Sequence, residues 1–563
     1  MTNSRVSSPV QLTRTVPFTS LPKTSALQAD YAYAPERLDR FFEHRWDGVD
    51  SLERIAPGIA ARAVNRESVA DVLAAQNRMF GSSERTFEHI ELLRHRDAVA
   101  VVTGQQAGLF GGPLFTIYKA LTAIELAARL RERGTPAVPV FWIASEDHDF
   151  EEVNHTTVAT RGAGLATVRV EPCAYEPDRP VGQVTLCAEI GQWVDELFEK
   201  LPRTIYSNQL RADLLSCYSP GAGFAEGFAR LMARLFAPFG VILLDPLRPE
   251  MKALAAPTYA RAIERTPEIA EALVHRSEEL VAAGYHAQVF TSPDMVPLLV
   301  LEEGRRRAMI RRDGRFELKS HDATYSADEL LEFAESDPER LSPNVTLRPV
   351  VQDTLLPTVG YVGGPAEVAY FAQIHPVYAI LDRPMPVIVP RASATIVDRD
   401  SRKTLERYGL SLEELVGDRE TRMRHIVERS LEGPTAALFD ETESNLARDL
   451  DRLRTALEAS DPTLSSSLDG SRRKMFYQVN KLRNRFIRAA AGRDETLRRR
   501  LEMAEAFLHP HDVLQERVLN VFTYLVLTGY GIVEDLADVL DPECRDHQVI
   551  DLGGIAGDVM IRA

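Results

Sequence analysis

A single β-loop-α-β unit between residues 97 and 155 constrains the fold of this chain more than any other segment. Residues 98–102 form an apolar strand that runs into the glycine-rich sequence TGQQAGLFGGP, and Pro113 opens a helix. A second apolar strand, residues 138–143, is followed by the acidic sequence EDHD. Because strand, helix and strand follow one another, the unit predicts an α/β fold with a parallel sheet.

The glycine-rich turn is a candidate substrate site. Ligands of open α/β sheets bind at the carboxyl ends of the strands, and glycines let backbone N–H groups approach a phosphate at a helix start. The predicted substrate-binding residues of this turn are Thr103, Gly104, Gln105, Gln106, Gly111 and Gly112. The turn matches neither GxxxxGK[ST] nor GxGxxG, so a purely structural turn is the alternative. Lys119, further into the helix, is interpreted as solvated.

The acidic cluster after the second strand is the predicted catalytic centre. Asp147 and Asp149 can hold an ammonium group, bind Mg²⁺ or act as a general base. His148 is a candidate base because imidazole titrates near neutral pH. The spacing of His148 and His155 matches no standard ligand signature, so no protein metal site is predicted. Solvated loop charge is the alternative interpretation.

A second turn repeats this pattern at Gly363, Gly364 and Pro365, after another apolar strand. Glu367 follows one helical turn later and is predicted to complete the catalytic pocket. The two glycines are predicted to bind substrate. A common preference for proline at the first helical position is the alternative explanation of the likeness.

The length of 563 residues predicts two or three domains. We expect a core over residues 1–400, with a helical N-terminal segment and insertions near 160–235 and 285–340. Strand-like alternation indicates an antiparallel insertion, beginning with HAQVF at residues 286–290 and followed by three further strands. One long helix is expected over residues 249–283.

The region 401–508 has a different, helical character. Apolar residues recur at helical spacing on both sides of a break near residues 459–470, which predicts an antiparallel coiled-coil hairpin. Two helices alone would leave its apolar stripe half exposed, so a homodimer through the hairpin is expected. Basic residues of the second helix are predicted to pair with acidic residues of the first. Residues 509–563 form a helical tail that packs on the core.

Charge and composition exclude several classes of protein. The net charge of −16 argues against general nucleic-acid binding. The N-terminus lacks the apolar core of a signal peptide, and no run of about 18 apolar residues predicts a membrane span. The four cysteines form no CxxC pair, which signals neither a zinc site nor a disulfide framework. A cytoplasmic protein is expected.

Several long strings resemble one family. VVTGQQAGLFGGPLFTIYKA, VPVFWIASEDHDFEEVNH, GYHAQV, SPNVTLRPVVQDTLLPTVGYVGGPAEVAYFAQ, VPRASAT and LQERVLN resemble the bacillithiol biosynthesis cysteine-adding enzymes, the BshC family. The resemblance implies a Rossmann-like core related to nucleotidyltransferases and class I aminoacyl-tRNA synthetases, and a coiled-coil domain for dimerisation. It also implies a ligase that joins cysteine to glucosaminyl-malate in the last step of bacillithiol synthesis.

Such a ligase must activate a carboxylate, so ATP or another nucleotide is expected as co-substrate, with Mg²⁺ as its companion. The predicted nucleotide-binding residues are Arg391, Ser393, Gln515 and Arg517. A structural network in which Glu516 pairs with these cations is the alternative. The HIGH and KMSKS strings of class I synthetases are absent. Activation by adenylation or by phosphorylation, a non-catalytic scaffold, and a nucleotidyltransferase acting on another acid therefore all stay open.

Overall fold

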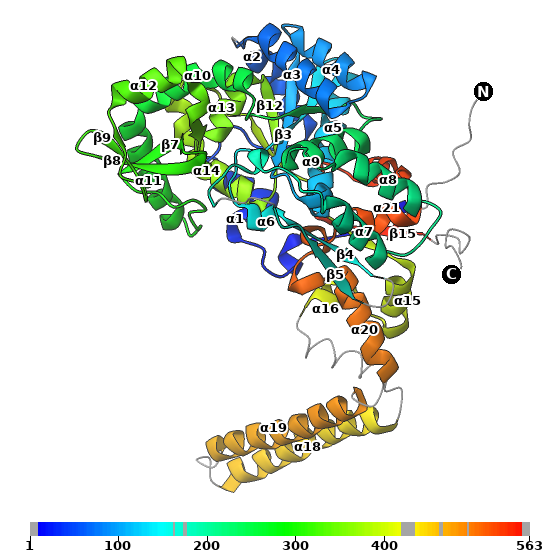
Figure 1. The fold of residues 1–563 in the computed structure, drawn as a ribbon. Helices are drawn as coiled ribbons and strands as arrows, with labels where there is room; N and C mark the ends of the chain where they lie inside the picture. The colour runs from blue at the N-terminus through cyan, green and yellow to red at the C-terminus, as the bar shows by residue number, and fades with distance from the viewer. Residues whose placement is uncertain are drawn as a thin grey trace.

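The computed structural model describes residues 10–62, 64–160, 164–172, 177–417, 434–460, 465–491 and 495–553. Its centre is a parallel sheet of five strands in the order β13-β12-β2-β3-β6 (Figure 1). The strands are β2 (Val99–Gln105), β3 (Ala137–Ile143), β6 (Ile242–Leu244), β12 (Thr358–Gly363) and β13 (Val387–Pro390). Nearly all their residues are buried, which explains why they appear in the sequence as continuous apolar runs. The predicted α/β class is confirmed.

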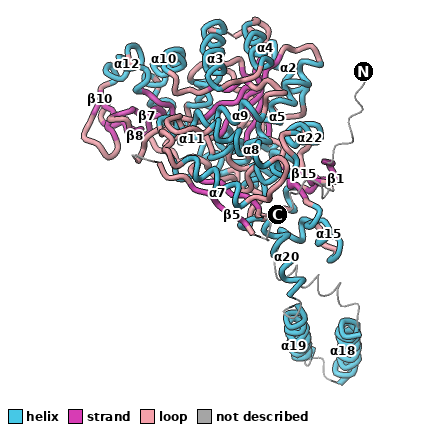
Figure 2. The backbone as a smooth tube through the Cα atoms, turned by 45° about the vertical axis from the view of Figure 1, so that its right-hand side comes forward, coloured by secondary structure: helices cyan, strands magenta, loops and turns pink. Residues whose placement is uncertain are grey.

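Helices surround this sheet, as Figure 2 shows with strands in magenta and helices in cyan. Helix α5 (Leu114–Glu132) follows the glycine-rich turn and packs on β2 and β3. Helix α14 (Pro365–Ile380) follows β12. The other covering helices are α2 (Val49–Ala60), α3 (Arg66–Phe80), α4 (Glu84–Arg94), α9 (Phe224–Leu235) and α13 (Arg348–Leu355).

The first insertion begins with a two-stranded hairpin, β4 (His155–Ala159) and β5 (Leu165–Arg169). The helices α7 (Ile190–Lys200) and α8 (Ser207–Cys217) follow it. Cys187 in this insertion is disulfide-bonded, a bond that the cysteine spacing in the sequence does not signal. Cys217 and Cys544 are free thiols.

The second insertion is an antiparallel sheet in the order β10-β9-β8-β7-β11. Its strands are β7 (Met295–Glu302), β8 (Arg305–Arg312), β9 (Arg315–Leu318), β10 (Thr324–Tyr325) and β11 (Leu341–Pro343), with α12 (Ala327–Ser336) beside them. The predicted strand HAQVF is wrong. Its Val289 gives its backbone N–H to the Gln373 side chain and accepts a hydrogen bond from it, at 2.9 and 2.7 Å, which replaces pairing in a sheet.

The predicted long helix over residues 249–283 is two helices, α10 (Pro249–Glu264) and α11 (Thr266–Ala282). Pro267 stands in the first turn of α11, where its missing N–H costs nothing. In the middle of one continuous helix the same proline would remove a hydrogen bond. The break at Arg265 therefore follows from the sequence.

The helical hairpin consists of α18 (Pro434–Ser460) and α19 (Ser465–Ala491). Ion pairs join the two helices as predicted, from Arg483 to Asp440 and from Arg472 to Asp451, each at 2.5 Å. Helix α20 (Glu495–Leu508) returns toward the core and packs on α15 (Arg399–Tyr408) and α16 (Leu412–Val416) (Figure 1).

The C-terminal segment contains α21 (Phe522–Thr528), α22 (Gly531–Val539) and β15 (His547–Leu552). Strand β15 lies between β1 (Val10–Val16), to which it is antiparallel, and β14 (Ala394–Val397), to which it is parallel. This three-stranded sheet brings the two ends of the described chain together.

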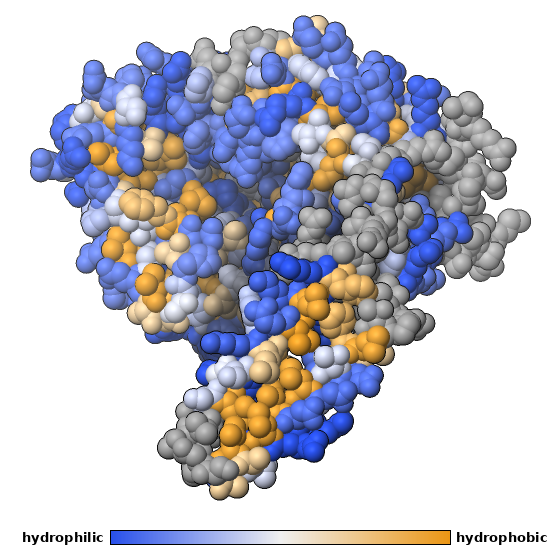
Figure 3. Space-filling model, turned by 90° about the horizontal axis from the view of Figure 1, so that it is seen from below, coloured by the Kyte–Doolittle hydropathy of each residue, from blue (hydrophilic) through white to orange (hydrophobic). Residues whose placement is uncertain are grey.

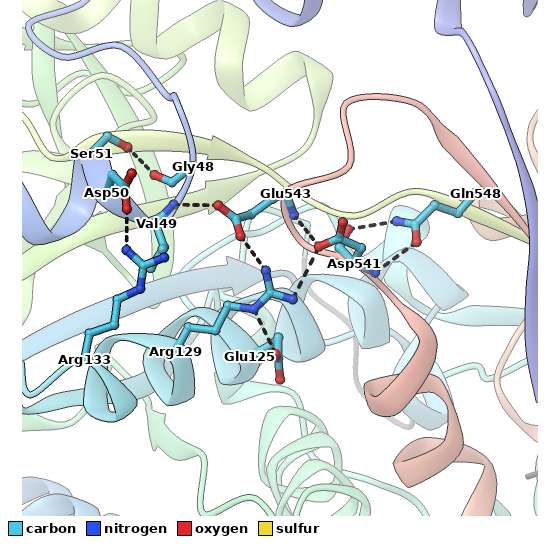
Figure 4. A network of polar contacts seen from close by, with 10 residues as sticks. All are labelled: Gly48, Val49, Asp50, Ser51, Glu125, Arg129, Arg133, Asp541, Glu543 and Gln548. Atoms are coloured by element: carbon cyan, nitrogen blue, oxygen red, sulfur yellow. Dashed lines mark hydrogen bonds and ion pairs between the residues drawn. The ribbon is translucent and has the colours of Figure 1, made fainter.

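Arg129 of α5 ties this C-terminal segment to the core (Figure 4). Its guanidinium contacts Glu125 at 2.9 Å, Asp541 at 3.3 Å and Glu543 at 2.5 Å. Glu543 in turn accepts the backbone N–H of Val49 at 2.8 Å, at the start of α2. Within the parts of the chain that the structure covers, no helix is both long and apolar enough to cross a bilayer.

Candidate active site

The strand order changes direction between β2 and β12, which are neighbours in the sheet although far apart in the sequence. Open parallel sheets bind ligands in the crevice at such a switch point, at the carboxyl ends of the strands. Gln105 ends β2 and Gly363 ends β12. Both predicted turns therefore lie on one rim, as expected.

The glycine-rich turn itself is buried and bonded to the C-terminal segment. Gly111 and Gly112 have φ angles of +95° and +68°, which L side chains rarely adopt. The Asn520 side chain donates to the carbonyl oxygens of Phe110 and Gly112 at 2.9 and 2.8 Å. These bonds give the turn a structural role that is independent of any ligand.

The first residues of this turn divide into a structural and a site-facing group. Thr103 is fully buried, and its hydroxyl donates to the Val362 carbonyl at 2.9 Å, which links β2 to β12. The Gln106 amide donates to Asp147 Oδ2 at 2.6 Å and to Glu152 Oε2 at 2.8 Å. The structure thus brings Gln106 and Asp147, from two predicted clusters, into direct contact.

The acidic cluster presents one oriented carboxylate and one unpartnered imidazole nitrogen. Asp147 Oδ1 accepts the backbone N–H groups of His148 and Asp149 at 2.8 and 3.4 Å. Asp149 caps the short helix α6 (Phe150–Val153) by accepting the Glu152 N–H at 3.2 Å. His148 Nδ1 is buried, has no hydrogen-bond partner among the described residues and lies 3.8 Å from Asp147 Oδ1.

Glu146, the first carboxylate of the cluster, has a structural role. It is buried and paired with Lys252 of α10. The Ser342 hydroxyl donates to Glu146 at 2.8 Å, and the Lys252 ammonium donates to the Leu341 carbonyl at 2.7 Å. This ion pair therefore fastens the exit of β3 to the second insertion.

Glu367 and Lys119 form a buried ion pair at the switch point. The Lys119 side chain is only 2% exposed, so its interpretation as solvated is wrong. Its ammonium also donates to the Gly104 carbonyl at 2.8 Å and to Gln105 Oε1 at 2.9 Å. Lys119 thus connects Glu367 to Gly104 and Gln105 at the end of β2.

Hydrogen bonds hold the Glu367 carboxylate from its other side. Glu367 accepts the Tyr361 hydroxyl at 2.6 Å and the Gly364 N–H at 2.8 Å. Burial alone would raise the pKa of Glu367, but the charge and hydrogen bonds of Lys119 lower it below its usual value. Burial lowers the pKa of Lys119, and the charge of Glu367 opposes this shift.

Arg348 of α13 adds a second cation to this crevice. Its guanidinium donates to the hydroxyl groups of Tyr361 and Tyr370 at 3.3 and 3.0 Å, and to Gln352 Oε1 at 3.0 Å. Sequence reasoning missed both Arg348 and Lys119. The signal for Lys119 was present, because it is a single charge within the apolar run LFTIYKALTAI.

Three of the four predicted nucleotide-binding residues belong to a buried network. Arg391 pairs with Glu516 at 2.5 Å, and Glu516 also accepts the Ser393 hydroxyl at 2.8 Å. The Gln515 side chain bonds the backbone N–H and carbonyl of Ile396 at 2.8 and 2.9 Å. Glu516, the alternative partner named from the sequence, therefore does pair with Arg391, whereas Arg517 is exposed.

A cavity of about 370 Å³ lies beside this network. Gly363, Pro365, Arg391, Ser393 and Arg517 line it, which brings the second predicted turn next to the predicted nucleotide residues. Further cationic or titratable side chains on its wall are Lys23, Tyr31, His286, His509, Cys544 and Arg545, and the acidic residues Asp512 and Glu516 also line it. The cavity thus combines the carboxyl ends of β12 and β13 with a lining in which lysine and arginine outnumber aspartate and glutamate.

Comparison with known proteins decides the family. Residues 15–392 match the N-terminal Rossmann-like domain of bacillithiol biosynthesis BshC, and residues 394–552 match its C-terminal coiled-coil domain. This chain belongs to the BshC family. The family predicted from the sequence is thereby confirmed, together with the combination of a Rossmann-like core and a coiled coil.

Curated BshC relatives match over nearly their whole length. A protein of Salinibacter ruber is 37% identical, with 93% of this chain and 96% of that relative covered. Relatives from Solibacter usitatus and Geobacillus kaustophilus are 36% and 32% identical, each with 94% of this chain and 98% of the relative covered. All three bear the name "Putative cysteine ligase BshC".

Within the described ranges of this BshC chain, no group of three or more His, Cys, Asp or Glu side chains is arranged to hold a metal ion. The residues that meet at the rim are instead suited to organic groups. Asp147 and Glu152 offer carboxylate oxygens to an ammonium, His148 offers a ring nitrogen to a proton, and Arg348 offers a cation to a carboxylate.

Proposed function

We propose that this chain is a ligase that forms the amide bond between the carboxyl group of cysteine and the amine of glucosaminyl-malate, in the cytoplasm. The names of its BshC relatives support a cysteine ligase of bacillithiol biosynthesis. The observation that carries the proposal is the contact between Gln106 and Asp147, because it joins the two predicted clusters in one oriented site at the rim.

The proposed reaction needs an activated carboxyl group. The amine nitrogen attacks the carbonyl carbon, a C–N bond forms, the bond from that carbon to the leaving oxygen breaks, and the amine loses one proton. His148 is the proposed acceptor of this proton, because its Nδ1 has no other hydrogen-bond partner. Asp147, fixed by Gln106 and by two backbone N–H groups, is the proposed holder of the cysteine ammonium.

Asp149 and Glu367 have more indirect proposed roles. Asp149 fixes the start of α6 and so the position of Glu152. Glu367 has its two oxygens occupied by Lys119, Tyr361 and Gly364, which favours a positioning role over proton transfer. Through Lys119 it orients Gln105, the predicted substrate-binding side chain next to Gln106.

The cavity of about 370 Å³ is the proposed nucleotide site. Its volume lies within the usual range of about 300–1,000 Å³ for small-molecule sites. ATP or another nucleotide would supply the phosphoryl or adenylyl group that activates the carboxyl group, with Mg²⁺ as its companion. Arg517, which makes no side-chain bond in the described structure, and Arg545 are proposed to contact its phosphates. The Gly363–Gly364 turn joins this cavity to Glu367.

The hairpin of α18 and α19 is the proposed homodimer interface. Five large apolar side chains of the hairpin are 44–62% exposed, namely Leu438, Leu453, Met475, Tyr477 and Leu482. Figure 3, viewed from below, shows hydrophobic residues gathered in a stripe along the projecting part of the molecule. Exposed apolar stripes of this kind are typical of coiled-coil partners.

The test is an assay of the purified chain with cysteine, glucosaminyl-malate and ATP, with mass spectrometry of the thiol product and of the nucleotide. We expect a product of cysteine plus the amine minus one water, together with AMP or ADP. Arg517→Gln should raise the KM for the nucleotide at least tenfold and leave the KM for cysteine unchanged. A cysteine adduct on a different amine, or turnover that is independent of nucleotide, would contradict the proposal.

A further inference from the structure

A second polar cavity lies at the amino ends of the parallel strands, opposite the carboxyl ends that carry the candidate active site. It has a volume of about 200 Å³ and is lined by residues of α3, α10, α13 and the loop after α14. Helix α13 ends just before β12 begins, and Arg383 precedes β13. The cavity therefore lies near the amino ends of these strands. Figure 1 shows α3, α10 and α13 at the end of the molecule away from the helical hairpin.

Cations dominate the polar part of this cavity. Arg261 and Arg383 both line it, and Arg62 lies close enough to Arg383 to act on its charge. None of these three guanidinium groups forms an ion pair or side-chain hydrogen bond within the described residues. Burial, followed by the charge of Arg261, lowers the pKa of Arg383. Arg62 and Arg261 are exposed and Arg383 is half-buried. An anion bound between these like charges would reduce their mutual repulsion.

Neutral hydrogen-bond donors complete the wall. Thr258 is 6% exposed, and its hydroxyl makes no hydrogen bond to the described chain. Asn65 caps α3 through its carbonyl oxygen, which accepts the Ser68 N–H at 3.3 Å and leaves the NH₂ group free to donate. The start of the 15-residue helix α3 adds a favourable dipole. All of these groups suit an acceptor-rich anion.

The nearest carboxyl groups do not neutralise the cluster. Asp353 and Asp382 are the acidic residues that act on Arg383. Asp353 is engaged by the Tyr378 hydroxyl at 2.6 Å and by the Gln352 amide at 2.9 Å, and burial raises its pKa to about 6. Asp382 is exposed and forms no ion pair with Arg383 among the described contacts. No acidic side chain lines the cavity.

We propose that this cavity binds a small tetrahedral oxyanion of the phosphate class, held by Arg261, Arg383, Thr258 and Asn65. Arginine forks match the oxygen geometry of such an anion, and each charge-assisted hydrogen bond is stronger than a neutral one. The bound anion would link α3, α10, α13 and the loop after α14, which all contribute residues to the cavity. The site is separate from the proposed nucleotide cavity, which shares none of its lining residues.

Thermal unfolding and isothermal titration with inorganic phosphate test this site. The full chain is compared in sodium phosphate and in sodium chloride at equal ionic strength and pH, with sulfate and a hexose phosphate as further arms. The variants are Arg261→Gln, Arg383→Gln and Thr258→Val. Arg452→Gln on α18, whose side chain is 80% exposed, controls for the lost charge, and Arg517→Gln controls for phosphate in the nucleotide cavity.

We expect phosphate to raise the unfolding temperature of the parent chain and of both control variants. Arg261→Gln and Arg383→Gln should each lower phosphate affinity about tenfold or more and abolish the shift. A hexose phosphate that binds as tightly as free phosphate would support the site and show that it also accepts a phosphate monoester. Equal unfolding temperatures in phosphate and chloride, or an undiminished shift in Arg383→Gln, would overturn the proposal.

Discussion

Lys119 and Glu367 form a buried ion pair that joins the helices following β2 and β12. The pair lies at the point where the strand order of the sheet reverses. It therefore forms the floor of the crevice in which such folds bind ligands. Its two side chains come from α5 and α14, the helices that follow the two glycine-proline turns. The likeness of the turns therefore has a structural counterpart, because the helix after each turn supplies one charge to a shared contact.

Glu367→Gln should destabilise the fold by about 3–5 kcal/mol, because it leaves the buried Lys119 ammonium without its counter-charge. The double variant Lys119→Met, Glu367→Gln should recover part of this loss. Urea unfolding measures both. Glu125→Gln on the same helix, which removes a partly exposed partner of Arg129, should cost about 1 kcal/mol or less. Equal losses in the single and double variants would show that the pair is not coupled.

Asp147→Asn should abolish product formation, because it removes the charge proposed to hold the cysteine ammonium, whereas Asp149→Asn should keep most of the activity; both should leave the unfolding midpoint nearly unchanged. Asparagine caps a helix as well as aspartate does, so α6 keeps its first turn in Asp149→Asn. The variants therefore test charge and not fold. Glu151→Gln, on the same turn with a side chain 75% exposed, is the matched control and should keep full activity. Normal turnover in Asp147→Asn would reduce the cluster to solvated loop charge.

The sheet could be predicted from the sequence because its strands are buried on both faces. Such strands appear as continuous apolar runs, and the residues that follow them must lie on one rim. That reasoning correctly placed Gln106, Asp147 and Glu367 at the carboxyl ends of the strands. The helical hairpin could also be predicted, because the spacing of its apolar residues and its opposite charges are both local properties of the sequence.

Contacts between distant segments could not be predicted. The pairing of β1 with β15 joins the two ends of the described chain, and no local pattern specifies that register. The burial of Lys119 depends on Glu367, and a sequence does not show which carboxylate meets a lysine in space. For the same reason the sequence did not decide whether Arg391 contacts a nucleotide or Glu516, and the structure shows the ion pair with Glu516.

Gly111→Ala and Gly134→Ala should destabilise the protein by similar amounts. Both glycines have similar positive φ angles, +95° and +92°, so both variants carry about 1–2 kcal/mol of backbone strain. A Cβ at Gly134 would meet nothing within 4 Å, and at Gly111 it would make only an ordinary van der Waals contact, 3.5 Å from Leu231. The loss in urea unfolding therefore measures the backbone strain at each site. A clearly larger loss in Gly111→Ala would show that the buried turn cannot accommodate the added methyl group.

Deletion of α18 and α19 should convert the protein from dimer to monomer, which light scattering measures directly. Leu453→Glu and Leu482→Glu should have the same effect without shortening the chain, because both side chains are largely exposed in one subunit. Arg452→Gln is the control on the same hairpin and should stay dimeric. A dimer that survives the deletion would place the interface on the core.

Stability should fall with acid through His547, which is fully buried between the hydroxyl groups of Ser393 and Thr395, at 2.8 Å each. Burial lowers the pKa of His547 to about 4, whereas an unfolded histidine titrates near 6.5. Between these values the unfolded chain binds more protons than the folded one. Stability therefore falls as pH decreases from about 6.5 to about 4, and the loss from this residue between pH 7 and 5 is about 2 kcal/mol.

His547→Gln should remove that share of the pH dependence, because glutamine can hydrogen-bond to both hydroxyl groups but does not titrate. Urea unfolding at pH 5 and pH 7, at constant ionic strength, measures it. His89, whose pKa burial also lowers to about 4, remains in the variant and contributes to the residual slope. The double variant His89→Gln, His547→Gln should have a smaller slope still, to which His44 and His375 contribute because burial also lowers their pKa values. An unchanged difference between pH 5 and 7 in His547→Gln would mean that this imidazole is already protonated in the folded protein, with Glu516 as its counter-charge.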